Sequence, residues 1–391
     1  MIVGVSKEIY PGERRVALTP AVVPLLAKAG LEVVIEAGAG ASAGYPDAQY
    51  QEKGAKILPD RAGVFAQADI VCQVLGHGAN DKTGSQDLPM LRRGQLLLAF
   101  LRPLGSPEAV RQVAQTGVSA FSVELMPRTT RAQSMDALSS MASIAGYKAV
   151  IVVADTLPRI FPMMTTAAGT ITPSKVLVIG AGVAGLQAIA TAKRLGSVVS
   201  AYDVRPAVKE QVQSLGGRFV ELPLETGDAQ DARGYAKAQD EAFYARQREL
   251  LGKVIAESDA VITTAVVPGK KAPVLVTEAM VKGMAPGSVV LDLAAERGGN
   301  CELTRAGETI VAHGVTIIGP INLAGTAPYH ASQMYAKNLT TFLVNLVKDG
   351  KVRPPESDEI IRETLLTEGG EVVNARVRES MGLPALTASN K

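Results

Sequence analysis

The sequence predicts an α/β protein of two domains, each built around a parallel sheet. Its 391 residues exceed one ordinary domain of ~100–200 residues. Short apolar runs alternate with helical patterns, as they do in β-α-β units. A hydrophobic share of 47% with 20% charged residues indicates globular cores rather than disorder. Because aromatics reach only 4%, those cores consist mainly of Val, Leu, Ile and Ala.

Charge and cysteine usage exclude several classes of protein. Lys+Arg 40 against Asp+Glu 38 leaves a net charge of +2, too little for a nucleic-acid binder that relies on a basic field. Cys72 and Cys301 form no C-x-x-C pair, which favours a reducing, cytoplasmic setting. His313 and His330 have no partners at metal-ligand spacing, so we expect no metal site. Residues 1–7 do not resemble a signal peptide, and we expect no bilayer-spanning segment.

The N-terminal third shows the alternation first. Expected strands cover residues 2–5, 31–35 and 118–123. One helix starts at Thr19-Pro20, an N-cap followed by proline, and ends at Gly30. Another runs from Ser106-Pro107 to Gly117. This pattern predicts a parallel sheet covered by helices.

A second series begins near Thr172. The expected strands are 176–179, 198–202, 219–222, 260–265, 288–293 and 315–318, with helices at 186–195 and 205–215. The polar stretch 226–249 is unusually long for a connection, and such loops tend to be functional. Its end, 238–251, has helical character.

A long helix is expected at 332–347, with Leu339, Phe342, Leu343 and Leu346 on one side. We expect this helix to pack back against the N-terminal domain. The first domain is then discontinuous, 1–130 plus 330–391, and the second domain, 140–328, is inserted into it.

A G-x-G-x-x-G turn formed by Gly180, Gly182 and Gly185 follows the strand 176–179 and opens a helix. The first glycine permits the tight turn, the second lets a pyrophosphate approach the backbone, and the third allows close helix–strand packing. The helix N-terminus offers unpaired N–H groups and a positive dipole end to the phosphates. This context predicts a Rossmann-like dinucleotide-binding domain. The alternatives are a turn kept only for packing and a site for another nucleotide.

Asp203 ends the next strand, about 20 residues after the turn. A carboxylate there accepts hydrogen bonds from the adenosine ribose and repels a 2′-phosphate, so NAD(H) is favoured over NADP(H). Arg205 could instead accept a phosphate. The residues expected to bind the cofactor here are Gly180, Gly182, Val183, Ala184, Gly185, Asp203, Val204, Arg205, Thr264 and Ala265.

Several segments together resemble the NAD(H)-binding subunit of proton-translocating NAD(P) transhydrogenase, a relative of alanine dehydrogenase. They are Lys7-Glu8 with Pro11 to Pro20, Met126-Pro127-Arg128 with Arg131 to Ser140, Ala145-Gly146-Tyr147, the glycine turn to Gly196, Gly234-Tyr235-Ala236-Lys237, and Asp292 to Cys301. The stretch 131–136 and the loop 234–237 are specific to transhydrogenases, whereas the opening and the turn are shared with alanine dehydrogenase.

The resemblance implies roles for individual residues. Arg128, Gln133 and Asp136 match a loop that reaches over the nicotinamide, and Ser139 belongs to the same site. In relatives the arginine and aspartate hold the carboxamide end, and the glutamine touches the nucleotide on the partner subunit. Tyr235 matches the tyrosine of a mobile loop that closes over NAD(H). The plain alternative for the first three residues is a solvated helix start.

The chemistry separates the two relatives. Oxidising an amino acid releases a proton with the hydride, so alanine dehydrogenase needs positioned acid–base groups. Its lysine and histidine align here with Gln73 and Phe100, so both titratable groups are missing. His77 could substitute for them, although a loop histidine is more often only solvated. Direct hydride transfer needs no such pair, because the protein only holds two ring C4 atoms ~3–3.5 Å apart and excludes water.

Two further residues are candidates for the cofactor site. Glu296 aligns with an aspartate near the nicotinamide of alanine dehydrogenase, and its alternative is an ordinary carboxylate after a strand. Asn322 follows the strand 315–318 and could touch the ribose.

The sequence therefore predicts the NAD(H)-binding subunit of a Si-specific transhydrogenase, active only with partner subunits. The resemblance implies a homodimer, supported by the discontinuous domain, on the cytoplasmic face of a membrane. Its membrane-spanning and NADP(H)-binding components would lie on other chains. The alternatives are a free-standing amino-acid dehydrogenase and a non-catalytic NAD-sensing module.

Overall fold

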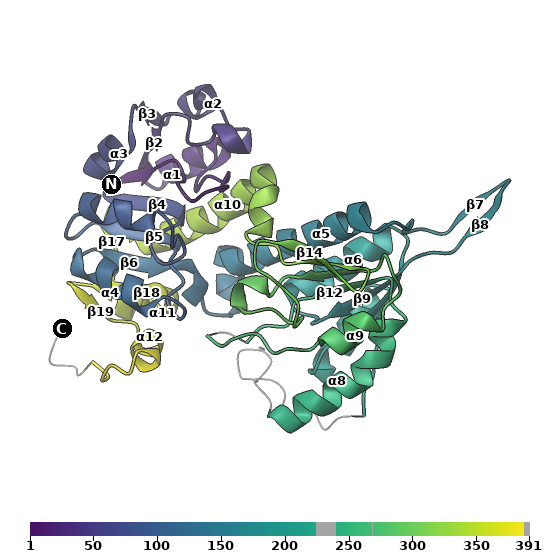
Figure 1. Ribbon diagram of the computed structural model, residues 1–391. Coiled ribbons are helices and arrows are strands. Elements are labelled where there is room, and N and C mark those ends of the chain that lie inside the picture. The colour runs from purple at the N-terminus through teal and green to yellow at the C-terminus, as the bar shows by residue number, and fades with distance from the viewer. Residues whose placement is uncertain (224–239, 268, 387–391) are drawn as a thin grey trace. The chain divides into compact units, whose positions relative to one another are not determined.

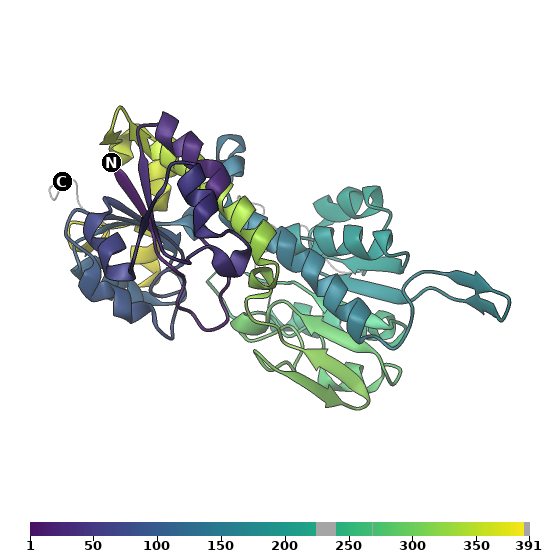
Figure 2. The same ribbon diagram turned by 90° about the horizontal axis from the view of Figure 1, so that it is seen from above.

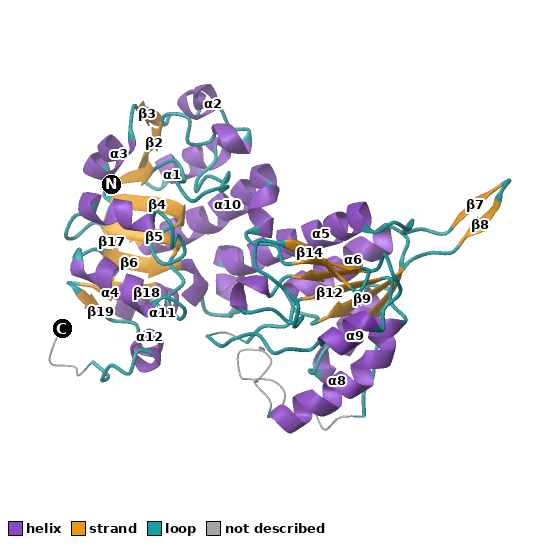
Figure 3. Ribbon diagram, in the orientation of Figure 1, coloured by secondary structure: helices purple, strands orange, loops and turns teal. Residues whose placement is uncertain are grey.

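The computed structural model describes residues 1–223, 240–267 and 269–386 (Figure 1). The chain divides into two compact units. Unit 1 comprises Met1–Met141 and Gly325–Lys391, and unit 2 comprises Ala142–Ala324. Each unit contains a mostly parallel sheet with helices, so the α/β fold class is confirmed (Figure 3). The sequence placed the end of the first domain at 130 and the start of the second at 140, whereas unit 1 extends to Met141. It placed the end of the inserted domain at 328, whereas unit 2 ends at Ala324.

Unit 1 holds an eight-stranded sheet in the order β19-β18-β6-β5-β4-β1-β2-β3. The strands are β1 Ile2–Val5, β2 Glu32–Glu36, β3 Lys56–Leu58, β4 Ile70–Leu75, β5 Leu96–Phe100, β6 Ser119–Ser122, β18 Leu365–Glu368 and β19 Glu371–Val372. Strands β1 to β6 pair in parallel, whereas β18 pairs antiparallel with both β6 and β19. The helices are α1 Val23–Lys28, α2 Asp47–Glu52, α3 Arg61–Gln67, α4 Pro107–Gln115, α10 Pro328–Leu346, α11 Glu359–Thr364 and α12 Ala375–Ser380.

Helices α4 and α10 cover opposite faces of the unit 1 sheet. Ala120 of β6 lies in one core cluster with Val113 of α4. Phe121, the next residue, stacks at a tilt on Phe342 of α10, with ring centroids 5.7 Å apart. Because successive strand residues point to opposite faces, the two helices lie on different sides. The expected return of the C-terminal helix to the N-terminal sheet is therefore observed, with the helix starting at Pro328, a favourable first position.

Unit 2 holds a seven-stranded sheet in the order β11-β10-β9-β12-β13-β15-β14. Its strands are β9 Lys175–Ile179, β10 Val198–Tyr202, β11 Arg218–Phe219, β12 Ala260–Thr263, β13 Val289–Asp292, β14 Thr309–Ala312 and β15 Val315–Ile318, and its helices are α6 Val183–Arg194, α7 Lys209–Ser214, α8 Glu241–Ala256 and α9 Glu278–Lys282. All pairs are parallel except β14 with β15. From β9 the chain proceeds to β10 and β11 on one side of the sheet, and it then continues with β12 and β13 on the other side of β9. Strands β9 and β12 therefore flank a topological switch point.

Helix α5, Ala137–Thr156, is long and apolar enough to cross a membrane by length and composition. Its Ala149, Val150 and Val153 are fully buried in the core of unit 2. Such burial is typical of the core helix of a globular domain, so length and apolar composition alone are weak evidence for a membrane span.

A hairpin of β7 Met164–Thr166 and β8 Gly169–Ile171 was not expected from the sequence. Every residue of both strands is exposed. Figures 1 and 2 show the hairpin projecting from the body of unit 2. The helix after the glycine turn also begins earlier than expected, at Val183, because the last residues of the motif already form its first turn.

Candidate functional site

The glycine turn joins β9 to α6, and its three glycines serve different purposes. Gly180 has φ +97°, a left-handed conformation that disfavours other residues. A Cβ on Gly185 would lie 1.8 Å from the Gly180 carbonyl oxygen, so this position holds the helix against the strand end. A Cβ on Gly182 would meet nothing within 4 Å. The fold therefore requires two of the glycines and leaves open space beside the third.

That open space lies at the N-terminus of α6. Gly182 is the N-cap, and no side chain caps the helix. The first helical bond runs from the Leu186 N–H to the Gly182 carbonyl oxygen at 2.8 Å. The amides of residues 183–185 thus have no acceptor within the helix, and the dipole places partial positive charge there. Unfilled space beside such amides fits a pyrophosphate group.

Asp203 follows β10, and its side chain is buried at the edge of the turn. Its Oδ2 accepts a hydrogen bond from the Ala181 N–H at 2.7 Å. The Arg205 side chain forms a two-pronged ion pair with the same carboxylate. The position expected for ribose recognition therefore lies beside the glycine turn.

The end of β12 packs against the turn as well. The Thr264 hydroxyl donates to the Gly180 carbonyl oxygen at 3.0 Å, which supports the left-handed turn. Ala265 exchanges hydrogen bonds with the Asn300 side chain, whose Oδ1 accepts from the Ala265 N–H at 3.0 Å and whose Nδ2 donates to the Ala265 carbonyl at 2.8 Å. The expected residues of β9, β10 and β12 are thus gathered at the carboxyl ends of adjacent strands.

Asp292 organises the loop after β13, a role that the sequence reasoning missed. The side chain is fully buried and accepts from five donors: the hydroxyls of Thr263 and Thr304 and the backbone N–H groups of Ala294, Asn300 and Cys301. The position of Asp292 at the end of a buried strand was the one sequence signal that could have indicated this role. By fixing residues 294–301, it also fixes the Asn300 amide that holds Ala265.

Glu296 and Asn322 lie together in unit 2. The Glu296 Oε1 accepts a hydrogen bond from the Asn322 N–H at 3.0 Å. Asn322 has φ +47°, a conformation that asparagine tolerates better than most residues. The contact gives Glu296 a structural role in holding this bend, and its expected contact with the cofactor stays a prediction. Tyr235 lies outside the described residues.

In unit 1, Arg128 and Gln133 are exposed on the loop that leads into α5. Asp136 instead caps α5, because its Oδ1 accepts from the Ser139 N–H at 2.9 Å and its Oδ2 from the Ser139 hydroxyl at 2.5 Å. These hydrogen bonds support the alternative interpretation of Asp136 as a residue at a helix start. The expected nicotinamide contacts of all four residues stay predictions.

The residues between them anchor this loop to the rest of unit 1. Arg131 donates to both carboxylate oxygens of Asp358 at 2.6 and 2.7 Å. This hydrogen-bonded pair holds the pKa of Asp358 well below its usual range. Asn338 of α10 donates to the Ser134 carbonyl at 2.9 Å. The loop therefore presents exposed polar side chains from a fixed backbone, a common arrangement in binding sites.

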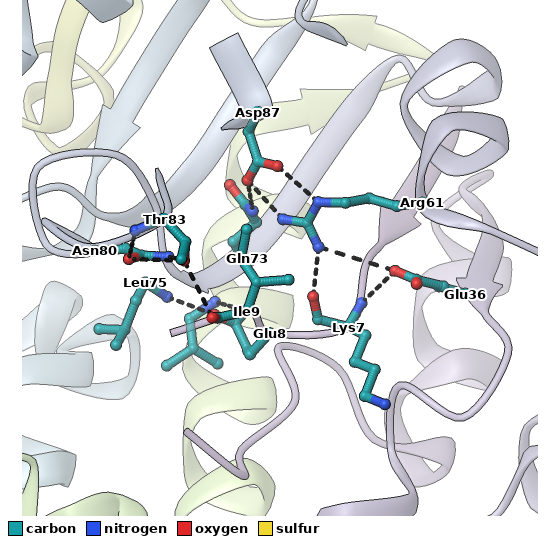
Figure 4. A network of polar contacts seen from close by, with 11 residues as sticks. Lys7, Glu8, Ile9, Glu36, Arg61, Gln73, Leu75, Asn80, Thr83 and Asp87 are labelled. Atoms are coloured by element: carbon teal, nitrogen blue, oxygen red, sulfur yellow. Dashed lines mark hydrogen bonds and ion pairs between the residues drawn. The ribbon is translucent and has the colours of Figure 1, made fainter. Parts of the chain in front are cut away.

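The positions aligned with the acid–base pair of alanine dehydrogenase are buried and structural. Gln73 is 2% exposed, and its amide donates to the Asp87 Oδ2 at 2.7 Å (Figure 4). Arg61 holds the same carboxylate through two bonds of 2.6 Å. Phe100 stacks on Tyr335, with centroids 5.4 Å apart. Neither position presents a titratable group.

Glu8 lies next to this network and retains partial exposure (Figure 4). Its carboxylate accepts from the N–H groups of Val74 at 2.7 Å and Leu75 at 3.1 Å. Desolvation and the charge of Glu13 raise the pKa of Glu8 to about 8, although these amide donors oppose the shift. The Nε2 of His77 hydrogen-bonds the Gln112 Oε1 at 2.6 Å, whereas its Nδ1 is buried and has no hydrogen-bond partner in the described part of the chain.

The protein thus has, in unit 2, a glycine turn of the kind found in dinucleotide-binding domains and, in unit 1, an anchored loop with exposed polar side chains. Family models agree over nearly the whole chain. Residues 4–145 match the alanine dehydrogenase/PNT N-terminal domain, and residues 149–375 match its C-terminal domain. The chain belongs to the alanine dehydrogenase/PNT family.

Within this family the chain is more similar to the transhydrogenase subunits compared than to the alanine dehydrogenases. It is 43% identical to "NAD(P) transhydrogenase subunit alpha" of Cereibacter sphaeroides, over 95% of this chain and 71% of that protein. A transhydrogenase structure from Sinorhizobium meliloti matches with TM-score 0.83 and 44% identity, over 96% of this chain and 100% of that chain. Alanine dehydrogenase of Bacillus subtilis is only 29% identical, over 98% of this chain and 95% of that protein.

Proposed function

We propose that this chain is the NAD(H)-binding subunit of a proton-translocating NAD(P) transhydrogenase. In the reaction, the hydride at C4 of NADH passes to C4 of NADP⁺ on a partner subunit, giving NAD⁺ and NADPH. The observation that carries the proposal is the combination of a phosphate-binding turn with two buried, non-titratable residues at the acid–base positions of alanine dehydrogenase.

The turn supports cofactor binding by this chain. The space beside Gly182 and the unbonded amides at the start of α6 suit the pyrophosphate, and Asp203 suits the ribose. Thr264, Ala265, Glu296 and Asn322 would border the remainder of NAD(H). The nicotinamide, when bound, supplies the hydride chemistry, and the protein supplies position and exclusion of water.

The unit 1 loop supports transfer to a second nucleotide. We assign Arg128 and Asp136 to the carboxamide end of the nicotinamide and the exposed Gln133 to the partner's nucleotide, with Ser139 positioning Asp136 through their hydrogen bonds. Gln73 and Phe100 argue against an amino-acid substrate, since each is engaged in unit 1 packing.

The subunit names of the relatives imply partner chains. We propose membrane-spanning and NADP(H)-binding partners, with this chain peripheral on the cytoplasmic face, and a homodimer. The hairpin favours self-association through unit 2 rather than unit 1. Two isolated strands are marginal in water, and Met163, Met164 and Ile171 are exposed at 66%, 41% and 42%. A second copy that covers them would explain both features.

Two assays test the proposed function. The first follows NAD⁺ reduction with L-alanine by the chain alone, and the second follows hydride exchange between NADH and an acetylpyridine analogue of NAD⁺. The exchange is measured with and without an added NADP(H)-binding component. We expect no alanine turnover and exchange only with that component. Alanine turnover would establish the dehydrogenase instead, and NADH binding without either reaction would establish a sensing module.

A matched pair of variants separates the loop's role from its fold. Gln133→Ala should lower hydride exchange at least tenfold while leaving the Kd for NADH unchanged. Thr130→Ala, an exposed change on the same loop, should leave both unchanged. Equal activity of the Gln133→Ala variant and the unmodified chain would remove Gln133 from the site.

A further inference from the structure

All four acceptor positions of the Asp203 carboxylate are occupied in this structure. An ionised carboxylate has about four lone-pair sites, two on each oxygen. Oδ1 accepts from the Arg205 N–H and from Arg205 Nε, both at 2.9 Å. Oδ2 accepts from the Ala181 N–H at 2.7 Å and from an Arg205 terminal guanidinium nitrogen at 2.8 Å.

The four donors are of two kinds. The amides of Ala181 and Arg205 belong to the backbone of the turn and of the segment after β10, so they stay when a ligand binds. The two guanidinium donors belong to a flexible side chain. If the guanidinium leaves, one acceptor site opens on each carboxylate oxygen, and two neighbouring hydroxyls of a ribose can fill this pair of sites.

We propose that Arg205 occupies, in the free protein, the two acceptor sites of Asp203 that the ribose 2′- and 3′-hydroxyls take when NAD(H) binds. The guanidinium fork and the ribose diol present two donors side by side to one carboxylate. Arg205 is therefore a positioning residue that competes with the cofactor and sets its affinity and specificity. The inference rests on the proposed placement of NAD(H) at the glycine turn.

Arg205 has opposite effects on the affinities for NADH and NADPH. Displacing an ion pair adds a cost to binding of NADH, so Arg205 weakens NADH and helps NAD⁺ to leave. With NADPH, the displaced guanidinium lies close to the 2′-phosphate and offsets its repulsion by Asp203. Arg205 therefore lowers affinity for the cofactor with a free diol and raises affinity for the one with a phosphate.

The test measures the Kd of NADH and of NADPH by calorimetry on the full chain and its variants. Arg205→Ala should bind NADH at least threefold more tightly, because the Arg205 and Asp203 side chains are only 13% and 5% exposed and loss of the guanidinium leaves a poorly solvated carboxylate that the ribose hydroxyls can satisfy. It should bind NADPH about tenfold more weakly. Arg205→Lys keeps the charge but loses the fork, so NADH should again bind more tightly while NADPH stays within about threefold of its original value.

Lys209→Ala is the matched control. It also removes one positive charge after β10, from an exposed pair with Glu221 at 2.5 Å, and should change neither Kd more than about twofold. A general loss of structure or of positive field would weaken both nucleotides together. If Arg205→Ala weakens NADH or leaves it unchanged, the inference is overturned.

Asp203→Asn distinguishes failure of this inference from failure of the proposed site. It should weaken NADH at least tenfold if the ribose binds there. If it does so while Arg205→Ala fails to tighten NADH, only the competition by Arg205 is wrong. If NADH binding is unaffected by Asp203→Asn, the placement of the cofactor itself is wrong and the inference falls with it.

Discussion

Gly182 and Gly185 offer a direct separation of cofactor binding from folding. Both belong to the glycine turn, but their surroundings differ. At Gly182, φ −77° and ψ −167° suit alanine, and a Cβ would meet nothing within 4 Å. At Gly185 a Cβ would lie 1.8 Å from the Gly180 oxygen, so α6 would have to move by more than about 1 Å to reach ordinary contact.

These geometries give different expected magnitudes. Gly182→Ala should change the free energy of unfolding by less than ~1 kcal/mol, because the smaller entropy of the unfolded chain offsets a poorer N-cap. Its methyl group projects into the space that the pyrophosphate would enter, so we expect NADH to bind 10- to 100-fold more weakly, about 1.4–2.8 kcal/mol. Gly185→Ala should destabilise unit 2 by ~1–3 kcal/mol through overpacking.

The assays are thermal unfolding and calorimetric titration with NADH, performed on both variants and on the unmodified chain. The expected pattern is normal stability with weak binding for Gly182→Ala, and lowered stability for Gly185→Ala. Tight NADH binding by a normally folded Gly182→Ala variant would refute the placement of the pyrophosphate at this turn.

Three further predictions concern Gly146 and Asp292 of unit 2 and Glu8 of unit 1. In Gly146→Ala the new Cβ would lie 2.1 Å from the Ala184 oxygen, so we expect a lower melting temperature and severalfold weaker NADH binding by calorimetry. Because the pKa of Glu8 in the folded state, about 8, exceeds its ordinary value of 4.5, its stabilising contribution is full below pH 4.5 and is lost as the pH rises through 8. The free energy of amide-exchange protection at Val74, corrected for intrinsic exchange rates, should thus fall from pH 5 to 8 relative to that of the Glu8→Gln variant. The slope should be below ~1.4 kcal/mol per pH unit. Equal slopes in the two proteins would contradict the raised pKa of Glu8. Asp292→Asn turns an amide group toward donors, so it should cost ~3 kcal/mol in thermal unfolding, and a change under 1 kcal/mol would contradict its role.

The sequence predicted the candidate turn well because its signals are local. Gly180 needs its positive φ whatever packs around it, and the strand before it is a continuous apolar run. The discontinuous first domain also followed from the sequence, since the apolar side of α10 required a partner. The hairpin β7–β8 was missed because all of its residues are exposed, so no pattern of burial marks its strands.

The sequence could not predict which hydrogen bonds the individual polar side chains form. Asp136 was assigned to the nicotinamide by resemblance, and its bonds to Ser139 appear only with the start of α5 defined. Asp292 draws donors from three segments, and nothing in its neighbours along the chain indicates the hydroxyl of Thr263.

What the sequence by itself determined is the alternation of the main core strands and helices, the turn that opens α6 and the strand that ends just before Asp203, because periodicity, capping and glycine conformations act over a few residues. Only the tertiary structure decided which lone pairs of Asp203 are filled, which glycine leaves open space, and which side chains hold the loop before α5. Most of those properties depend on atoms brought together from distant parts of the chain. The hydrogen bonds from Ala181 to Asp203, 2.7 Å, and from Asn338 to Ser134, 2.9 Å, are fixed by packing rather than by sequence spacing.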